Sequence, residues 1–216
     1  FRRVLFRSTT KTITNTAEYA FKFKQRNSFT LLAGQEFISN NSNSFSGSST
    51  GQTDDRLVLV SAGPTGFTAG SSMSEYAYAS YFGRLNYNLD SKYFVDLSVR
   101  NDQSSRFGRN LRGATFYSAG LMWKAKNEKF LQNVNWLNNL VVKGSIGTSG
   151  NSSIGNYQSL ATVGTNLYNS APGWGVSSAG NPELSWETQK QINIGTQATL
   201  FNKLNLDIEY FDRVTS

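Results

Sequence analysis

The sequence contains no cysteine and no histidine among its 216 residues. Without cysteine there is no disulfide framework and no thiolate metal site. Without histidine, the most common general base and transition-metal ligand are also missing. Proline is rare, with 3 residues, and no apolar run approaches the length that a membrane-spanning helix needs. Strands that cross a membrane are only half apolar, so this last absence leaves a membrane protein built from strands open.

Aromatic residues are plentiful instead, with 15 Phe and 10 Tyr, in a chain whose mean hydropathy is −0.41. The formal net charge is +7, and removing Arg2, Arg3 and Arg7 lowers it to +4, since 7 − 3 = 4. The remainder has no dense basic run and no nucleotide- or phosphate-binding motif. We therefore expect no nucleic-acid partner, no cofactor, no metal and no catalytic residue.

The first eight residues, Phe1 to Ser8, form a basic stretch that does not recur in the chain. With one permitted choice of codons, FRRVLFRS is encoded by TTC AGA CGT GTG CTC TTC CGA TCT, which resembles the end of a common short-read sequencing adaptor. We interpret residues 1–8 as a translated adaptor and residues 9–216 as a fragment of a longer protein. The alternative is the start of an ordinary basic amphipathic strand.

Apolar and polar residues alternate with a period of two through most of the chain, which predicts strands. The pattern gives an all-β fold of about eight antiparallel strands, over residues 13–24, 29–37, 81–90, 93–100, 115–123, 140–147, 186–200 and 204–211. Only residues 127–134, NEKFLQNV, suggest a helical turn.

The last predicted strand shows the two faces most clearly. Its apolar positions are Leu204, Leu206, Ile208 and Tyr210. Its polar positions are Asn205, Asp207 and Glu209. We expect the first set to face lipid and the second to face a wet lumen.

The connections between strands alternate in length. Short turns are predicted at residues 24–28, 89–92 and 201–203, and long polar loops at residues 38–74, 101–113 and 148–184. Long loops at one edge and short turns at the other are typical of outer-membrane barrels. A soluble β-sandwich that binds carbohydrate also alternates and is the alternative.

Three stretches resemble one family in particular. They are SYFGRLNYNLDSKYFVDLSVRNDQSSRFG (residues 80–108), LVVKGSIGTSGNSSIGNYQ (140–158) and NPELSWETQKQINIGTQATLFNKLNLDIEYFDRVTS (181–216). Together they are similar to the carboxyl-terminal barrel region of the SusC/RagA family of TonB-linked outer-membrane proteins. The resemblance covers most of residues 29–216. Gln103 departs from the pattern, because the family usually has Gly there.

The resemblance implies a fold and a function that the residues alone do not give. It implies a barrel of about 22 strands, of which this chain would be an open, curved segment. It also implies an amino-terminal plug domain, which the chain lacks, a SusD-type surface lipoprotein as lid, and import of oligosaccharide or peptide with energy from TonB. A complete eight-stranded barrel is disfavoured, because the family motifs continue past both ends of the matched region.

Two sets of residues are candidates for chemistry. Asp207 and Glu209 could pair as the carboxylates of a glycosidase, but a polar lumen row explains them better. Tyr157, Tyr168 and Trp174 lie on a predicted outer loop, where flat aromatic faces could stack on substrate or on a lid. Packing of the loop on itself is the alternative. We expect contact with substrate or lid at these three residues and no catalytic site.

Overall fold

The computed structural model describes residues 2–216, so Phe1 lies outside the described residues. Eight antiparallel strands form one sheet, in the spatial order β1-β2-β3-β4-β5-β6-β9-β10. The strands are β1 (Arg2–Phe23), β2 (Asn27–Thr50), β3 (Thr65–Leu89), β4 (Tyr93–Ser104), β5 (Gly113–Lys124), β6 (Leu137–Asn151), β9 (Glu187–Leu200) and β10 (Leu204–Thr215).

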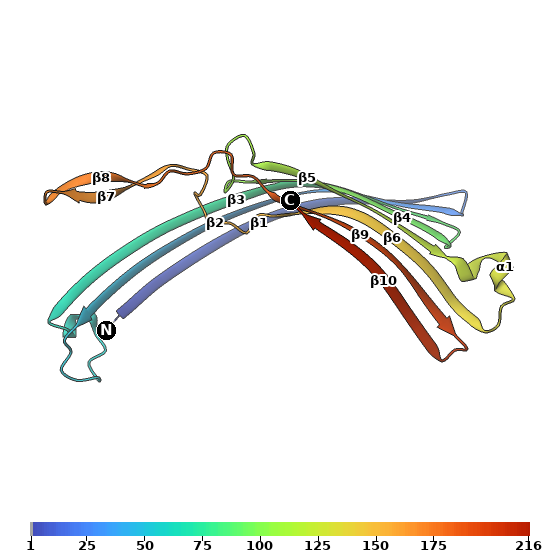
Figure 1. Cartoon of the computed structure of the whole chain (residues 1–216), viewed down its shortest axis with the longest axis horizontal. Coiled ribbons are helices and arrows are strands. Elements are labelled where there is room, and N and C mark those ends of the chain that lie inside the picture. Colours follow the sequence, from blue (N-terminus) through green and yellow to red (C-terminus); the bar gives the residue numbers. More distant parts are fainter. Residues whose placement is uncertain (1) are drawn as a thin grey trace.

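The sheet is open and curved, as the sequence predicts. Figure 1 shows a single arched layer whose two edge strands, β1 and β10, lie far apart. Each edge strand pairs with one neighbour only, β1 with β2 and β10 with β9. A β-sandwich is therefore wrong, because the described residues form one layer and a separate two-stranded hairpin.

Helices are scarce and short. They are η1 (Val60–Ala62), η2 (Ala125–Asn127) and α1 (Lys129–Gln132), and the last two confirm the predicted helical turn between β5 and β6. Within residues 2–216, no helix combines the length and the apolar composition that are needed to cross a bilayer.

The short turns share one backbone geometry. The two residues at the centre of each turn have positive φ angles: Lys24 and Gln25, Asp90 and Ser91, Phe201 and Asn202. Two consecutive left-handed residues define the type I′ turn, whose twist matches that of the flanking strands. These turns join β1 to β2, β3 to β4 and β9 to β10 at one end of the sheet, together with the helical connection between β5 and β6. The connections from β2 to β3, from β4 to β5 and from β6 to β9 lie at the other end.

The prediction of a long loop over residues 38–74 is wrong. Most of residues 38–74 are strand, because β2 continues to Thr50 and β3 begins at Thr65, and the two pair almost without interruption. This stretch is rich in Ser, Asn, Gly and Thr, which read as loop residues. Their side chains form hydrogen-bonded cross-strand pairs, such as Ser44 with Ser72 at 2.7 Å and Ser48 with Thr68 at 2.5 Å.

The third long loop also contains strands that the sequence did not predict. β7 (Thr162–Tyr168) and β8 (Ala171–Ser178) form a hairpin, which lies outside the main sheet and extends in the same direction as the far end of β3 (Figure 1). Asn169 and Ser170 have φ angles of 48° and 66° and make another type I′ turn.

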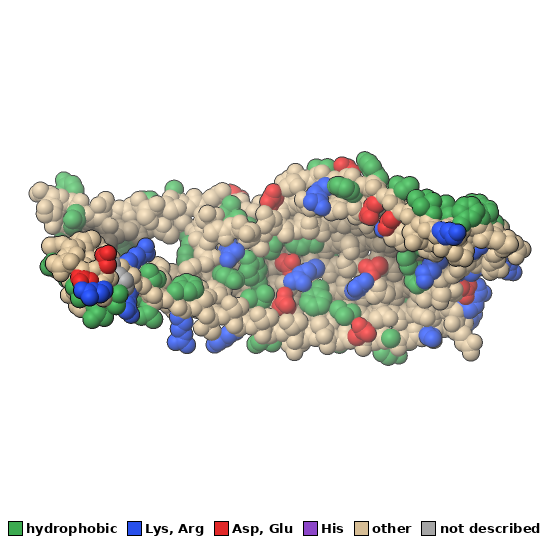
Figure 2. Space-filling view, turned by 90° about the horizontal axis from the view of Figure 1, so that it is seen from below, with side chains coloured by type: hydrophobic (Ala, Val, Ile, Leu, Met, Phe, Trp, Pro, Cys, Tyr) green, Lys and Arg blue, Asp and Glu red, His purple; other side chains and the backbone are tan. Residues whose placement is uncertain are grey.

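The two faces of the sheet differ in chemistry. We call the concave face the inner face; it carries the polar residues of the strands, and its charged side chains gather near the middle of the sheet (Figure 2). The outer face carries exposed apolar residues such as Leu97, Leu121, Ile194 and Ile208, which are 42%, 63%, 58% and 64% exposed. Among the described residues only five hydrophobic side chains are buried, so the sheet has almost no core of its own.

Candidate functional site

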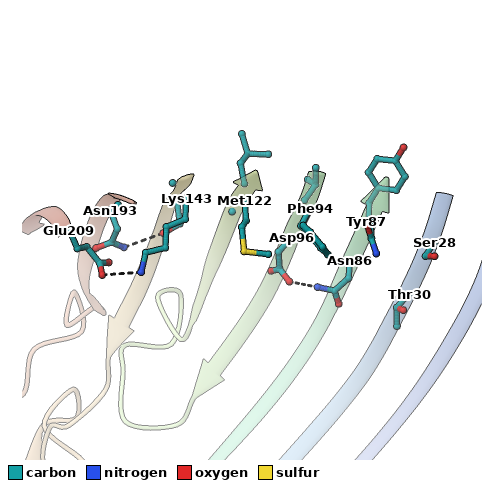
Figure 3. A pocket seen from close by; sticks show the side chains of 17 residues that line it. Ser28, Thr30, Asn86, Tyr87, Phe94, Asp96, Met122, Lys143, Asn193 and Glu209 are labelled. Carbon is teal, nitrogen blue, oxygen red and sulfur yellow. Dashed lines mark hydrogen bonds and ion pairs between the residues drawn. The ribbon is translucent and has the colours of Figure 1, made fainter. Parts of the chain in front are cut away.

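A hollow of about 560 Å³ lies on the inner face, toward the end with the short turns. Neighbouring strands place its side chains in cross-strand rows. In Figure 3, Asn86, Asp96, Met122 and Lys143 project from one side of the sheet, whereas Tyr87 projects from the other. Gly120 and Gly195 have no side chain and so leave space over part of the floor of the hollow. Phe94 and Met122 add apolar surface. The hollow therefore mixes hydrogen-bonding groups with apolar contact area.

Charged residues at this hollow are paired across strands. Lys143 Nζ lies 3.3 Å from Glu209 Oε2 and 4.0 Å from Asp207 Oδ1. Arg84 donates to Asp96 Oδ2 at 2.5 Å, and Asn86 donates to the same oxygen. Asp207 and Glu209 thus share a cation instead of flanking an open space, which is the arrangement of a polar lumen row and not of a glycosidase pair.

A second ion network lies farther toward the long-loop end of the inner face. Arg100 Nε donates to Asp102 Oδ1 at 2.5 Å, and its Nη2 lies 3.0 Å from Ser80 Oγ and 3.3 Å from Glu36 Oε1. The network joins β2, β3 and β4, because these residues sit at matching register positions. It gives the inner face a fixed pattern of both charges.

Three aromatic rings fasten the long loops to one another. Trp186 lies just before β9 and not within it, contrary to prediction. Its ring centroid is 4.8 Å from that of Phe107 and 5.7 Å from that of Phe116. Its indole N–H donates to the Arg112 carbonyl at 2.9 Å. We call this group the mouth lock; Phe107 is only 1% exposed and Phe116 8%, so the lock holds two of the few buried apolar side chains of residues 2–216.

Arg106, next to Phe107, holds the following loop in place. Its guanidinium lies 4.2 Å from the ring centroid of Tyr76 and donates to Asn156 Oδ1 at 2.7 Å. Asn156 in turn donates to Ser74 Oγ at 2.5 Å. A planar cation that stacks and donates at once is suited to this task. The β6–β7 connection is therefore anchored on β3.

The three aromatic residues predicted as contacts do not come together. Trp174 and Tyr168 are each 84% exposed and lie on the β7–β8 hairpin. Trp174 pairs with Thr165 and Tyr168 with Ala171, so they stand on opposite faces of the hairpin. Tyr157 lies away from both, where its hydroxyl accepts a hydrogen bond from the Glu75 N–H at 2.7 Å.

Ion pairs also link the connections at the short-turn end. Asp90 accepts two hydrogen bonds from Arg26 in the neighbouring turn, and these bonds hold the pKa of Asp90 below its ordinary value. Glu128 accepts from the Tyr93 hydroxyl at 2.6 Å and from Lys92 at 3.1 Å, which lowers the pKa of Glu128. Both carboxylates stay ionised below the pH at which free ones protonate.

A sheet with an apolar outer face, a polar inner face and its three tight hairpin turns at one end defines a segment of a membrane β-barrel wall. The chain belongs to the family described as TonB dependent receptor-like, beta-barrel, which matches residues 1–216. It is a SusC/RagA-type member of that family, as the sequence motifs indicate. The family consists of receptors and transporters, not enzymes.

Individual relatives agree with this assignment. The chain is 37% identical to the TonB-dependent receptor SusC of Bacteroides thetaiotaomicron over 132 residues, which is 57% of this chain and 13% of SusC. It is 33% identical to the TonB-dependent receptor P39 of Formosa agariphila over 150 residues, 68% of this chain and 14% of that protein. A solved structure of the RagAB peptide transporter is 45% identical, with a TM-score of 0.90, and the match covers 99% of this chain and 24% of the solved chain.

Sequence reasoning missed the mouth lock and the Arg106 anchor. The signals are present in the sequence, because the R-F-G and N-P-E-L-S-W stretches both lie within the motifs that resemble the family. What the sequence did not show was that they touch. Gly108 donates its N–H to the Leu184 carbonyl at 3.0 Å, a contact between segments far apart in the chain.

Proposed function

We propose that this chain is part of the barrel wall of a longer TonB-linked importer in the outer membrane. The observation that carries the proposal is the pair of opposite faces on one sheet. An apolar outer face with side chains such as Leu97 and Ile208 suits lipid, whereas the ion-paired inner face suits a water-filled or plug-filled lumen. Membership of the receptor family supports the same function.

The plug and the segment that contacts TonB belong, in this proposal, to the part of the longer protein outside residues 9–216. The chain spans between 13% and 21% of the length of the curated relatives that it matches. The importer would take up oligosaccharide or peptide and work with a SusD-type surface lipoprotein. The similarity to the RagAB peptide transporter, at 45% identity, favours peptide.

Tyr157, Tyr168 and Trp174 remain our candidates for contact with the substrate or the lid. The exposure of Tyr168 and Trp174 on a hairpin at the long-loop end supports this role. Tyr157 is at least partly occupied by its hydrogen bond to β3.

The function is tested by deleting the gene of the full-length receptor and restoring it on a plasmid. We expect restored cells to take up labelled peptide only when TonB is present, because the receptor has no energy source of its own in the outer membrane. Uptake that does not depend on the receptor or on TonB would contradict the proposal. Uptake of oligosaccharide but not of peptide would keep the importer and change its substrate.

We also propose that residues 1–8 derive from a sequencing adaptor. Arg2–Ser8 lie on β1 and pair with Ser42–Ser48 of β2. A strand edge of this kind pairs mainly through main-chain groups, so this pairing places few demands on side-chain identity. Sequencing the parent gene tests the proposal: a different sequence upstream of Thr9 is expected, and the same eight codons in an intact gene would overturn it.

A further inference from the structure

β3 is much longer than β4, and this difference leaves one of its edges open. Pairing between β3 and β4 ends at Tyr78 with Ser104, whereas β3 begins at Thr65 and pairs with β2 along nearly its whole length. Within residues 2–216, no other strand pairs with the segment from Thr65 to Ala77. A row of main-chain N–H and C=O groups therefore faces away from the sheet there.

The alternation of the ladder identifies these groups. The Ala77 N–H donates to Ser105 Oγ at 2.9 Å, and the Ala77 carbonyl accepts from the Ser105 N–H at 3.0 Å, both on the open side. Glu75 points to the same side, because its N–H donates to the Tyr157 hydroxyl. Every second residue points the same way in an antiparallel strand. The next ones along the regularly paired part of the open edge are Met73, Ser71 and Ala69.

Other parts of the chain form hydrogen bonds with main-chain groups of the open edge at two positions, Ala77 and Glu75, and not beyond them among the described residues. Ser105 and Tyr157 take the places that a neighbouring strand would otherwise occupy at Ala77 and Glu75. No hydrogen bond of this kind is found at Met73, Ser71 or Ala69 among the described residues. The edge is thus shaped to accept a strand and is filled only at its inner end.

From Thr68 to Ser74 the open edge also lacks the features that keep strand edges from pairing. The irregularity in the β2–β3 register lies before it, between Thr65 and Thr68. Proteins usually protect an exposed edge with lysine, proline, inward-pointing charge or a bulge. Residues 66–74, GFTAGSSMS, contain no charged residue and no proline. Their register with β2 is regular from Thr68 onward. Small side chains at Ala69 and Ser71 leave the main chain accessible.

A hollow of about 680 Å³ lies where the open edge meets the filled positions. Lys11, Asn41, Glu75, Tyr157 and Leu160 are among its lining residues. It offers both signs of charge, an amide and an apolar surface. A chain that paired with the edge would bring its end, or a side chain near its end, into this hollow.

We propose that the open edge of β3, from Ala69 to Met73, binds an extended peptide substrate by main-chain pairing. The inference rests on the proposed function and names its substrate class. Only a peptide has donors and acceptors at the spacing of a strand, so an oligosaccharide cannot form this ladder. Affinity from the main chain would let one receptor capture peptides of many sequences.

The variant Ser71→Pro in the full-length receptor tests the edge directly. It removes one N–H from the open side and, because that N–H does not point to β2, it costs no bond of the β2–β3 ladder. The control is Ser71→Val, which changes the side chain and keeps the N–H. The probe is a labelled, uncharged octapeptide of Ala, Ser and Thr, and its partner is the same peptide methylated at every amide nitrogen.

We expect Ser71→Pro to weaken binding of the octapeptide about tenfold or more, and Ser71→Val to leave it nearly unchanged. The methylated peptide should bind the unaltered receptor at least as weakly. Equal binding by both variants, or equal binding of both peptides, would overturn the inference. So would loss of the lid lipoprotein from Ser71→Pro, since the edge would then hold the lid.

These outcomes are separate from a failure of the proposed function. If Ser71→Pro leaves TonB-dependent peptide uptake intact, the edge is not the binding site and the importer stands. If the unaltered receptor takes up no peptide at all, the importer proposal itself loses its peptide substrate.

Discussion

The surroundings of Gly108 leave no space for a side chain. A Cβ atom built on it would lie 1.8 Å from the Pro182 carbonyl oxygen. Because this oxygen belongs to the backbone, the loop would have to move to relieve the contact. Gly108 therefore lets the β4–β5 loop approach the segment before β9 and brings Phe107 against Trp186.

Gly108→Ala is expected to loosen the mouth lock by about 1–3 kcal/mol, the usual cost of overpacking. The measurement is hydrogen exchange of residues 105–112 in the intact receptor. Gly113→Ala is the matched control, because its Cβ would make only ordinary contacts, with the Gln103 side chain at 3.6 Å and the Asp102 carbonyl oxygen at 4.0 Å. Similar exchange in the two variants would show that the close approach does not hold the loop.

Ile208 and Asp207 are neighbours on opposite faces of β10. If the outer face meets lipid near the bilayer midplane, Ile208→Arg should cost about 2–4 kcal/mol. Asp207→Arg should mainly change the charge near Lys143, because it lies on the inner face. Abundance in the outer membrane and heat-modifiable mobility on gels measure the difference. Equal insertion defects would contradict the assignment of the faces.

The protonation of Glu128, at the short-turn end, should follow pH with a lowered pKa. Its pKa is lowered by hydrogen bonds from Tyr93, Lys92 and Trp123. The stabilisation is therefore fully present above the pKa of a free glutamate and is lost only as pH falls through the lowered value. Protonation of Glu128 should quench the fluorescence of Trp123, which donates to it. The difference in fluorescence between the unaltered receptor and Glu128→Gln should therefore vanish at a pH below the ordinary glutamate pKa. A step at or above that pKa would contradict the shift.

At the scale of elements, the alternation of apolar and polar residues predicted the strands whose outer face is apolar. It did not predict the parts of β2 and β3 nearest the long-loop end. Residues 93–100 and 204–211 were predicted because apolar and polar side chains alternate there. The far ends of β2 and β3 escaped prediction, since most side chains on both of their faces are polar or small and the few large apolar ones, such as Phe45, Phe67 and Met73, do not alternate regularly. Their strand geometry is held by pairing between hairpin partners and not by burial of one face.

The same limit applies to the candidate site. Aromatic residues in the last long loop were visible in the sequence, but their arrangement was not. The type I′ turn at Asn169 and Ser170 lacks the usual Asn-Gly or Asp-Gly signal. Without the hairpin register, nothing in the sequence places Trp174 and Tyr168 on opposite faces.

Trp174→Ala in the full-length receptor is expected to weaken substrate capture or lid docking by about 1–3 kcal/mol, as for an interface anchor of moderate strength. Folding should change little, because the hairpin lies outside the main sheet. Tyr168→Ala is the comparison on the opposite face and tells which face makes contact. Uptake and lid recovery that stay unchanged at matched abundance would remove Trp174 from the site.

At the scale of the whole molecule, the chain forms an open sheet and not a closed barrel. Its two edge strands do not meet, and its outer face leaves large apolar side chains uncovered. Such a sheet cannot be stable in water by itself, because uncovered apolar area and open edges favour aggregation. Its stability is expected to come from the rest of the barrel and from lipid, which is also why its faces are so sharply divided.

Spin labels on β4 test that division most directly. The chain contains no cysteine, so, once any cysteine elsewhere in the receptor has been replaced, single cysteines can be placed along Phe94–Val99 of the full-length protein in lipid. We predict that labels at Val95, Leu97 and Val99 are accessible to oxygen dissolved in the bilayer. Labels at Asp96 and Ser98 should instead be accessible to a water-soluble nickel chelate, or to neither probe if a plug covers them. Accessibility that does not alternate with a period of two, or that alternates in the opposite sense, would contradict the account.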